Sequence, residues 1–184
     1  MWNPEHYQRA IAFAGEAHAA QLYPGSKANY VVHLAQVTME ILHAWAQAPG
    51  DWDVDLAMQC ALLHDCLEDT DTPYTALEAA FGERIAKGVQ ALSKDESLPK
   101  AERMLDSLNR IKSLGMPEIA MVKLADRITN LQAPPRGWDQ AKIARYRDEA
   151  GLILAQLGHA SDFLASRLQH KIAAYRHYIQ DQVP

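Results

Sequence analysis

Four ionisable side chains lie close together directly after an apolar run, in the stretch ALLHDCLEDTDT over residues 61–72. They are His64, Asp65, Glu68 and Asp69. On a helix, residues four apart lie one above the other, so His64 would lie beneath Glu68 and Asp65 beneath Asp69. This arrangement is poorly suited to a core and well suited to a site that binds an ion or transfers protons.

Two more ionisable residues interrupt apolar helical patterns elsewhere in the chain. His33 lies in the apolar, periodic stretch NYVVHLAQV, and Asp126 lies inside the run MVKLADRITNLQ. Because an unpaired carboxylate is very costly to bury, Asp126 needs a partner. If these two residues converge with His64 and Asp65, two imidazoles and two carboxylates would bind one divalent cation. Such a mixed N and O ligand set suits manganese, iron, zinc or cobalt.

The chemistry expected at such a site is hydrolysis of a phosphorylated compound. A bound cation would polarise a phosphoryl oxygen and lower the pKa of water toward neutrality. Glu68 and Asp69 follow one turn beyond the ligands, where they would take the proton or orient the attacking water.

Each of these residues also has an ordinary structural interpretation. His33 alone is more often a histidine that is hydrogen-bonded within the fold than a metal ligand. Asp126 alone is most often half of an ion pair with a neighbour such as Lys123 or Arg127. The letters EDTD usually mark a helix end followed by a turn that caps the next helix. The metal site is favoured because the three segments occur together and in this order.

The elements that must position these residues are all predicted to be helices. Apolar residues recur at spacings of three and four, and no alternating β-branched run is long enough for a sheet. Glycine and proline mark the breaks. The sequence thus predicts an all-α, compact orthogonal bundle, with helices over residues 4–20, 31–48, 53–68, 74–81, 83–92, 100–114, 117–131, 138–157 and 160–181.

The composition favours one domain over residues 1–184, because 48 % of the chain is hydrophobic. The formal net charge of −5 argues against a nucleic-acid partner but allows a nucleotide-sized ligand. The start, MWNPEHYQRA, does not resemble a signal peptide, and no apolar stretch is long enough to span a membrane. We therefore expect a cytoplasmic protein without a membrane partner. Cys60 and Cys66 would point in different directions on one helix, so we expect no disulfide.

The order H…HD…D resembles that of the HD-domain phosphohydrolase superfamily. The flanking stretch ALLHDCLEDTDTPYTALEAAFGERIAKGVQALSKD is similar to the hydrolase domain of RelA/SpoT-type enzymes, which has an HDxxED signature, and VKLADRITN is similar to its KLADR…N helix. AHAAQLYPGSKANYVVH resembles the preceding family segment, in which His-x-x-Gln, a loop and Tyr-x-x-His follow in order. LPKAER and GWDQAKIARYRDEA look like segments of the small, stand-alone alarmone hydrolases. The resemblance extends over residues 14–150.

This resemblance implies an HD-domain orthogonal helical bundle. It also implies removal of pyrophosphate from the 3′ position of a purine alarmone, (p)ppGpp or (p)ppApp, with one Mn²⁺ ion as the usual metal. The substrate would be a small-molecule nucleotide, and the products would be pyrophosphate and a 5′-nucleotide. No synthetase domain fits in the remaining length.

The site residues follow from the same resemblance. The metal-ligand positions match His33, His64, Asp65 and Asp126. The catalytic carboxylate pair matches Glu68 and Asp69, and a ribose-facing asparagine matches Asn130. Lysine and arginine can neutralise a pyrophosphate, and tyrosine offers a ring and a hydroxyl. The remaining substrate contacts implied are Lys100, Arg103, Lys142 and Tyr146.

Two departures from the family pattern bear on the substrate. Family members have an Arg-Lys run after the glutamine, whereas here Gln21 is followed by Leu22, Tyr23 and Pro24. Neither leucine nor proline can stack on guanine as arginine does, but Tyr23 can stack on either purine. Adenine alarmones are therefore at least as strongly indicated as guanine ones. Leu34 replaces the usual proline after the histidine, which alters the helix start but removes no ligand.

Two other functions stay open. One is an HD-domain nucleotide phosphohydrolase acting on the 2′-phosphate of NADPH, on nucleoside monophosphates or on dNTPs. The other is a nucleotide sensor without catalysis. The pair Glu68 and Asp69 favours the alarmone hydrolase, because many HD nucleotidases lack this extension. A homodimer is also left open, because the apolar side of the last helix would pack internally or against a second subunit. That side consists of Phe163, Leu164, Leu168, Ile172, Tyr175 and Ile179.

Overall fold

The computed structural model describes residues 2–179, and these residues form a helical bundle without a strand. A single antiparallel bridge joins Leu22 and Asn29. The all-α prediction is therefore confirmed for the described part of the chain. In order, the helices are α1 (Pro4–Ala17), α2 (Val31–Gln47), α3 (Val54–Leu63), α4 (Cys66–Asp69), α5 (Tyr74–Phe81), α6 (Glu83–Leu92), α7 (Arg103–Leu114), α8 (Pro117–Asn130), α9 (Gln140–Leu157) and α10 (Asp162–Tyr175), with 3₁₀ turns at Gly158–Ala160 and Arg176–Tyr178.

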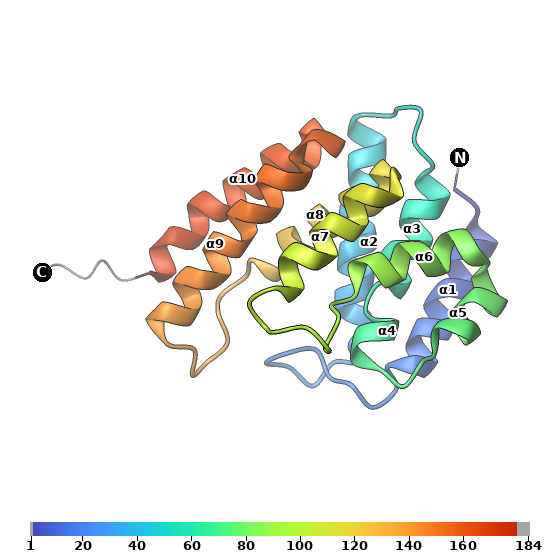
Figure 1. The fold of residues 1–184 in the computed structure, drawn as a ribbon, viewed down its shortest axis with the longest axis horizontal. Coiled ribbons are helices and arrows are strands. Elements are labelled where there is room, and N and C mark those ends of the chain that lie inside the picture. The colour runs from blue at the N-terminus through green and yellow to red at the C-terminus, as the bar shows by residue number, and fades with distance from the viewer. Residues whose placement is uncertain (1, 180–184) are drawn as a thin grey trace, which may run out of the picture.

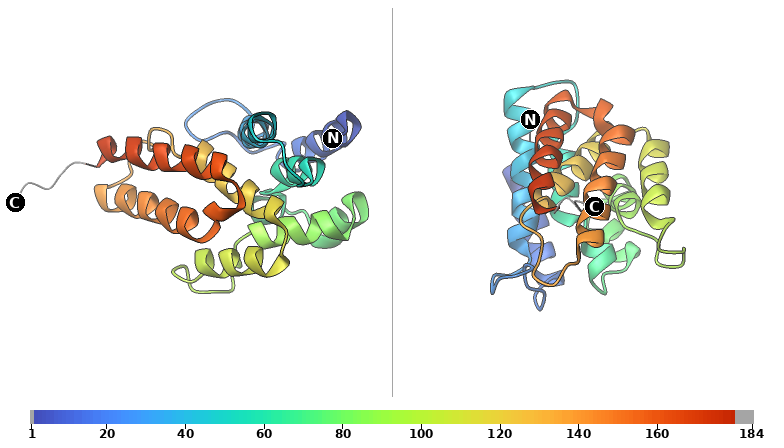
Figure 2. Two further views of the ribbon diagram at one scale, coloured as in Figure 1. Left: turned by 90° about the horizontal axis from the view of Figure 1, so that it is seen from above. Right: turned by 90° about the vertical axis from the view of Figure 1, so that its left-hand side faces the viewer.

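The helices α3 and α8 form the centre of the bundle. Every α3 residue from Leu56 to Leu63 is buried, as is every α8 residue from Glu118 to Thr129. The helix α2 packs against both, α1 packs against α3, and α10 packs against α8 and α9. Figures 1 and 2 show α9 and α10 side by side at one end of the long axis and α1, α5 and α6 at the other.

The last helix packs within the chain. Leu164, Leu168 and Tyr175 are buried, and Phe163, Ile172 and Ile179 are partly buried against the same core. An ion pair joins α10 to α2, because Arg167 Nε donates to the buried Glu40 carboxylate at 2.6 Å.

The predicted helix over residues 53–68 is wrong in one respect, because it is interrupted at His64 and Asp65. The imidazole Nδ1 of His64 lies 2.8 Å from the carbonyl oxygen of Ala61. In an uninterrupted helix that carbonyl accepts from the N–H of residue 65. The predicted stacking of His64 beneath Glu68 is not observed, because Glu68 turns instead toward the end of α6.

Other helix boundaries differ by a few residues from the prediction. The first helix ends at Ala17 and the seventh begins at Arg103, because short turns occupy the flanking residues. Residues 180 and 181, predicted to end the last helix, lie outside the described residues. Cys60 and Cys66 are both buried and unpaired, as expected. Within residues 2–179, no helix combines the length and apolar character that a membrane span requires.

Gly88 lies where α6 packs closely against the core. A Cβ atom on Gly88 would lie 2.6 Å from Ile119 Cδ1 and 3.1 Å from Cys60 Sγ, and both neighbours are fully buried. Gly151 in α9 has no neighbouring atom within 4 Å of the same position. The glycine in α6 therefore allows close approach, whereas the glycine in α9 has no packing role.

These two glycines give a matched pair of substitutions. Both changes to alanine gain helix propensity worth about 0.5–1 kcal/mol. We expect Gly151→Ala to raise the free energy of unfolding by about that amount. Gly88→Ala should instead lower it by about 1–3 kcal/mol, because the new methyl group overpacks the core. Urea denaturation measures both. Equal stabilisation by the two changes would contradict the close packing of α6.

Candidate functional site

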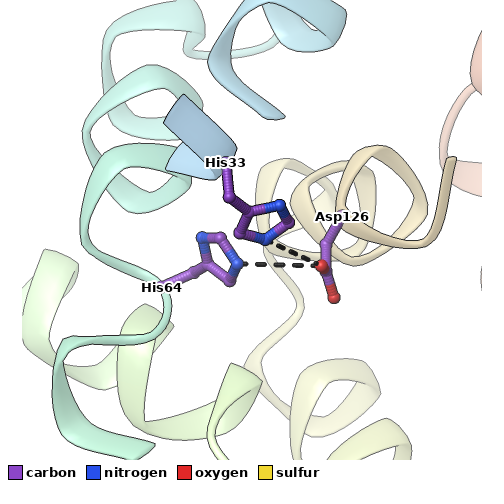
Figure 3. Close-up of side chains that lie close together, drawn as sticks. All are labelled: His33, His64 and Asp126. Atoms are coloured by element: carbon purple, nitrogen blue, oxygen red, sulfur yellow. Dashed lines mark ion pairs between the residues drawn. The ribbon is translucent and has the colours of Figure 1, made fainter. Parts of the chain in front are cut away.

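Three helices bring two histidines and one carboxylate together. His33 lies in the first turn of α2, His64 directly follows α3, and Asp126 lies in α8. Nε2 of His33 is 3.4 Å from Asp126 Oδ1, and Nε2 of His64 is 3.7 Å from the same oxygen. Figure 3 shows both imidazole rings pointing toward this carboxylate. All three candidate ligand atoms lie within 4.8 Å of one another.

The two imidazoles are arranged as metal ligands would be. Nδ1 of His64 lies 2.8 Å from the Ala61 carbonyl, which can only accept, so this nitrogen carries a proton and Nε2 is the nitrogen that would bind a metal in the neutral ring. Among residues 2–179, neither Nε2 of His33 nor Nε2 of His64 has a hydrogen-bond partner, although both are buried. Buried polar atoms are rarely left unpaired. The donor set therefore fits a divalent cation between these side chains.

Asp65 borders the same cluster. Its Oδ2 atom is 3.0 Å from Nε2 of His64 and 3.6 Å from Nε2 of His33. The hydroxyl of Tyr30 donates to this oxygen at 2.6 Å. The positive charge of His64 outweighs the effect of burial and holds the pKa of Asp65 well below its usual range. Asp65 therefore lies beside the group formed by His33, His64 and Asp126, and Tyr30 sets its orientation; its role as a fourth ligand stays a prediction.

Asp126 is both an ion-pair partner and a member of the cluster. Its Oδ2 atom accepts from Lys123 Nζ at 3.3 Å, and its Oδ1 atom accepts from the Asn130 amide and faces the histidines. Burial disfavours the charged carboxylate, but Lys123 and the imidazoles outweigh it, so the pKa of Asp126 lies well below its usual value. Both sequence interpretations of this residue therefore describe part of its surroundings.

The charge of His64 responds to the same carboxylates. Burial disfavours its imidazolium form, yet Asp65 and Asp126 outweigh burial and hold the pKa of His64 well above the usual value. A cation and this proton would compete for the same pair of carboxylates.

Glu68 and Asp69 are adjacent in sequence but have different partners. The carboxylate of Glu68 accepts from Lys94 twice, from Nζ at 2.6 Å and from the backbone N–H at 2.9 Å. Asp69 accepts from the Gln21 amide at 3.1 Å. Burial and the charge of Asp65 raise the pKa of Asp69. Both carboxylates line a hollow of about 510 Å³ beside Gln21.

A second cavity, of about 180 Å³, adjoins the cluster at His33 and Asn130. Aromatic rings dominate its walls, and stacking on such rings is a common way to bind a base. None of its lining residues, all within the described part of the chain, is a lysine or an arginine. The aromatic residues that line it are Tyr23, Tyr30, Trp138, Tyr146 and Tyr175.

The predicted substrate residues are distributed unequally around this cavity. Tyr23, Asn130 and Tyr146 line it. The Tyr146 ring lies 4.3 Å from the guanidinium carbon of Arg127, and burial raises the pKa of Tyr146 to about 12. Lys142 lies at its edge, with Nζ 4.2 Å from the ring centre of the lining residue Trp138.

Lys100 and Arg103 lie in and after the turn that precedes α7. Arg103 donates to the carbonyls of Leu98 at 2.9 Å and Glu96 at 2.7 Å, so it stabilises its own loop. Lys100 is exposed, and neither residue is part of the cavity wall. Their contact with a substrate stays a prediction.

Sequence reasoning did not assign several residues of this site. Tyr30 could have been assigned from the sequence, because it lies three residues before His33 and would therefore lie on the same face of a helix. No local sequence pattern indicates Lys94, since its contact with Glu68 depends on the packing of α6 against α4. Trp138 and Tyr175 reach the cavity only through the arrangement of α9 and α10 around it.

Comparisons with known proteins show the family to which the chain belongs. The family model described as HD domain matches residues 10–164. The zebrafish protein named guanosine-3′,5′-bis(diphosphate) 3′-pyrophosphohydrolase MESH1 is 32 % identical over 86 % of this chain and 88 % of its own length. The human protein of the same name is 30 % identical over 88 % and 89 %.

A solved structure adds support from the fold. It is described as a metazoan ortholog of SpoT that hydrolyzes ppGpp, and it superimposes with a TM-score of 0.80 at 25 % identity. The match covers 97 % of this chain and 99 % of that one. The chain therefore belongs to the HD domain family and, within it, to the branch that contains the MESH1 proteins.

Proposed function

We propose that this protein is a metal-dependent hydrolase that removes pyrophosphate from the 3′ position of a purine alarmone. The observation that supports this most directly is the pair of buried Nε2 atoms that face the carboxylate of Asp126 without a hydrogen bond, beside an aromatic cavity. Relatives named for hydrolysis of guanosine-3′,5′-bis(diphosphate) match nearly the whole chain, which supports the same substrate class.

The ion that we propose is Mn²⁺, held by His33, His64, Asp65 and Asp126. The N and O donors suit manganese but also accept iron, zinc or cobalt. Such an ion supplies Lewis-acid polarisation of a phosphoryl oxygen and lowers the pKa of water. The hydrogen bonds from Tyr30 to Asp65 and from Lys123 to Asp126 would hold these two carboxylates in place for such an ion.

Glu68 and Asp69, the carboxylates beside the cluster, would orient the attacking water and accept its proton. Water attacks the phosphorus next to the ribose 3′ oxygen, its oxygen bonds to that phosphorus, and the bond from phosphorus to the 3′ oxygen breaks. We assign the water proton to Asp69, whose raised pKa suits a base that later returns it to the departing 3′ oxygen. Glu68 would orient the water.

The base and ribose would lie in the aromatic cavity. Tyr23 and Tyr146 offer rings for stacking, and Asn130 lies between the cluster and the cavity, where a ribose would sit. Lys142 and, with less structural support, Lys100 and Arg103 would meet the phosphates. Because the cavity wall contains no arginine, we propose that adenosine alarmones are accepted at least as well as guanosine ones.

Product analysis tests the proposed reaction. The Mn²⁺-loaded protein should release pyrophosphate from guanosine or adenosine 3′-pyrophosphate alarmones, with the matching 5′-nucleotide as second product. NADPH, nucleoside monophosphates and dNTPs serve as comparison substrates. Orthophosphate from one of these alone would identify the alternative nucleotide phosphohydrolase. Bound metal without turnover of any substrate would support a sensor.

Substitutions should separate metal binding from proton transfer. His64→Ala and Asp65→Ala should lose metal and activity together, because each removes a ligand. Glu68→Gln should keep the metal and lower kcat by about 10²–10⁴-fold. Tyr30→Phe removes only the hydrogen bond to Asp65, so metal affinity should fall by about 10–100-fold. Metal content by elemental analysis, measured beside kcat, checks each variant. Full turnover by Glu68→Gln would remove Glu68 from the reaction.

The base preference can be tested at an exposed position. The wild-type protein should turn over the adenosine alarmone at least as fast as the guanosine one. Leu22→Arg introduces the stacking group that this chain lacks at a residue that is 58 % exposed, so it should not disturb folding. The ratio of kcat/KM values should then shift toward guanosine. A strong guanosine preference of the unsubstituted chain would refute the proposal.

A further inference from the structure

The carboxylate of Glu68 is held at both oxygens by a single residue. Oε1 lies 2.6 Å from Lys94 Nζ, and Oε2 accepts from the Lys94 backbone N–H at 2.9 Å. Charge-assisted hydrogen bonds of this kind are the strongest that side chains form. Burial disfavours the charged form of Lys94, but the charge of Glu68 outweighs it and raises the pKa of the lysine, so Lys94 stays charged.

Lys94 is itself fixed by contacts between α6 and α7. It follows Ser93, whose carbonyl accepts from Arg110 at 2.7 Å. The hydroxyl of Ser107 donates to the carbonyl of Ala91 at 2.7 Å, and Asp106 orients Arg110 through a 2.7 Å bond. The last carbonyls of α6 are thus bound by side chains of α7. The Lys94 backbone N–H is therefore directed at Glu68 whatever the lysine side chain does.

Asp69 is held much more loosely. Its partner is the neutral amide of Gln21 at 3.1 Å, and its side chain lines the 510 Å³ hollow that it shares with Glu68. Each oxygen of Glu68 retains a second lone pair for a water molecule, while the two hydrogen bonds from Lys94 fix the position of the carboxylate. The two neighbouring carboxylates therefore differ in freedom of movement and in the charge of their partners.

We propose that Lys94 is a positioning residue that fixes Glu68 as a charged, immobile acceptor for the attacking water, so that Asp69 is the carboxylate that takes up the water proton. This inference rests on the proposed hydrolysis of a 3′-pyrophosphate. Lys94 acts through Glu68 and not on the substrate, since its ammonium and its backbone N–H both bind the same carboxylate.

Three variants test this role with a matched control. Lys94→Gln should lower kcat by about 10–100-fold with KM changed less than about 2-fold, because only the positioning of the water is lost. Lys94→Arg should recover much of that loss, since it keeps the charge. Lys87 is the control: it lies on α6, which ends two residues before Lys94, and it forms a 2.6 Å ion pair with Glu83, but both side chains are largely exposed. Lys87→Gln should leave kcat and KM unchanged.

A double-mutant cycle tests whether Lys94 acts through Glu68. In a Glu68→Gln background, adding Lys94→Gln should lower kcat by less than about 2-fold. The same four proteins can be unfolded in urea without metal or substrate. The changes in the midpoint of unfolding should not add up between the two substitutions, which would show that Lys94 and Glu68 interact. Metal content should stay equal to that of the wild-type protein.

The possible failures are distinguishable. If the wild-type protein releases no pyrophosphate from either alarmone, the proposed function is refuted, and with it the role of Lys94. If the wild-type protein is active and Lys94→Gln lowers kcat by the same factor with and without Glu68→Gln, only the role of Lys94 is refuted. A rise in KM with unchanged kcat would likewise overturn it, because Lys94 would then bind substrate directly.

Discussion

The buried carboxylate of Asp126 is the constraint on which the rest of the structure depends. It lies on α8, whose residues from Glu118 to Thr129 are all buried, and the residue is only 7 % exposed. An ionised group in this position is tolerated only with partners at both oxygens. Lys123 occupies one oxygen, and Asn130 and the two imidazoles surround the other. The packing of α2 and α3 on α8 is therefore tied to this charge.

The same principle separates the functions of the surrounding carboxylates. Asp65 and Asp126 face histidines and have lowered pKa values, so they remain anions that attract a cation. Asp69 faces a neutral amide and a like charge, and its pKa is raised. Asp65 and Asp69 are close in sequence but have opposite pKa shifts, because the groups around each of them come from different parts of the fold.

Most helices and several residues of the candidate site could be predicted from the sequence, because they depend on the spacing of nearby residues. The spacing of apolar residues indicated the helices, and His33, His64 and Asp126 were recognisable as polar interruptions of apolar runs. The interruption between α3 and α4 could not be predicted, because the residues around it have good helical spacing and the break involves a side-chain hydrogen bond of His64. Lys94 and Trp138 could not be assigned either, since their roles arise from contacts between helices distant in the chain.

The break after Leu63 also explains how two successive residues, His64 and Asp65, both reach the cluster around Asp126. In a continuous helix, neighbouring side chains diverge by about 100° around the axis, since 3.6 residues complete a turn. His64 and Asp65 would then point to different sides of α3, and one of them would face away from the cluster. With the helix interrupted, Asp65 Oδ2 lies 3.0 Å from Nε2 of His64. A regular helix at this point would turn one of these two side chains away from His33 and Asp126, so the local irregularity keeps both beside the cluster.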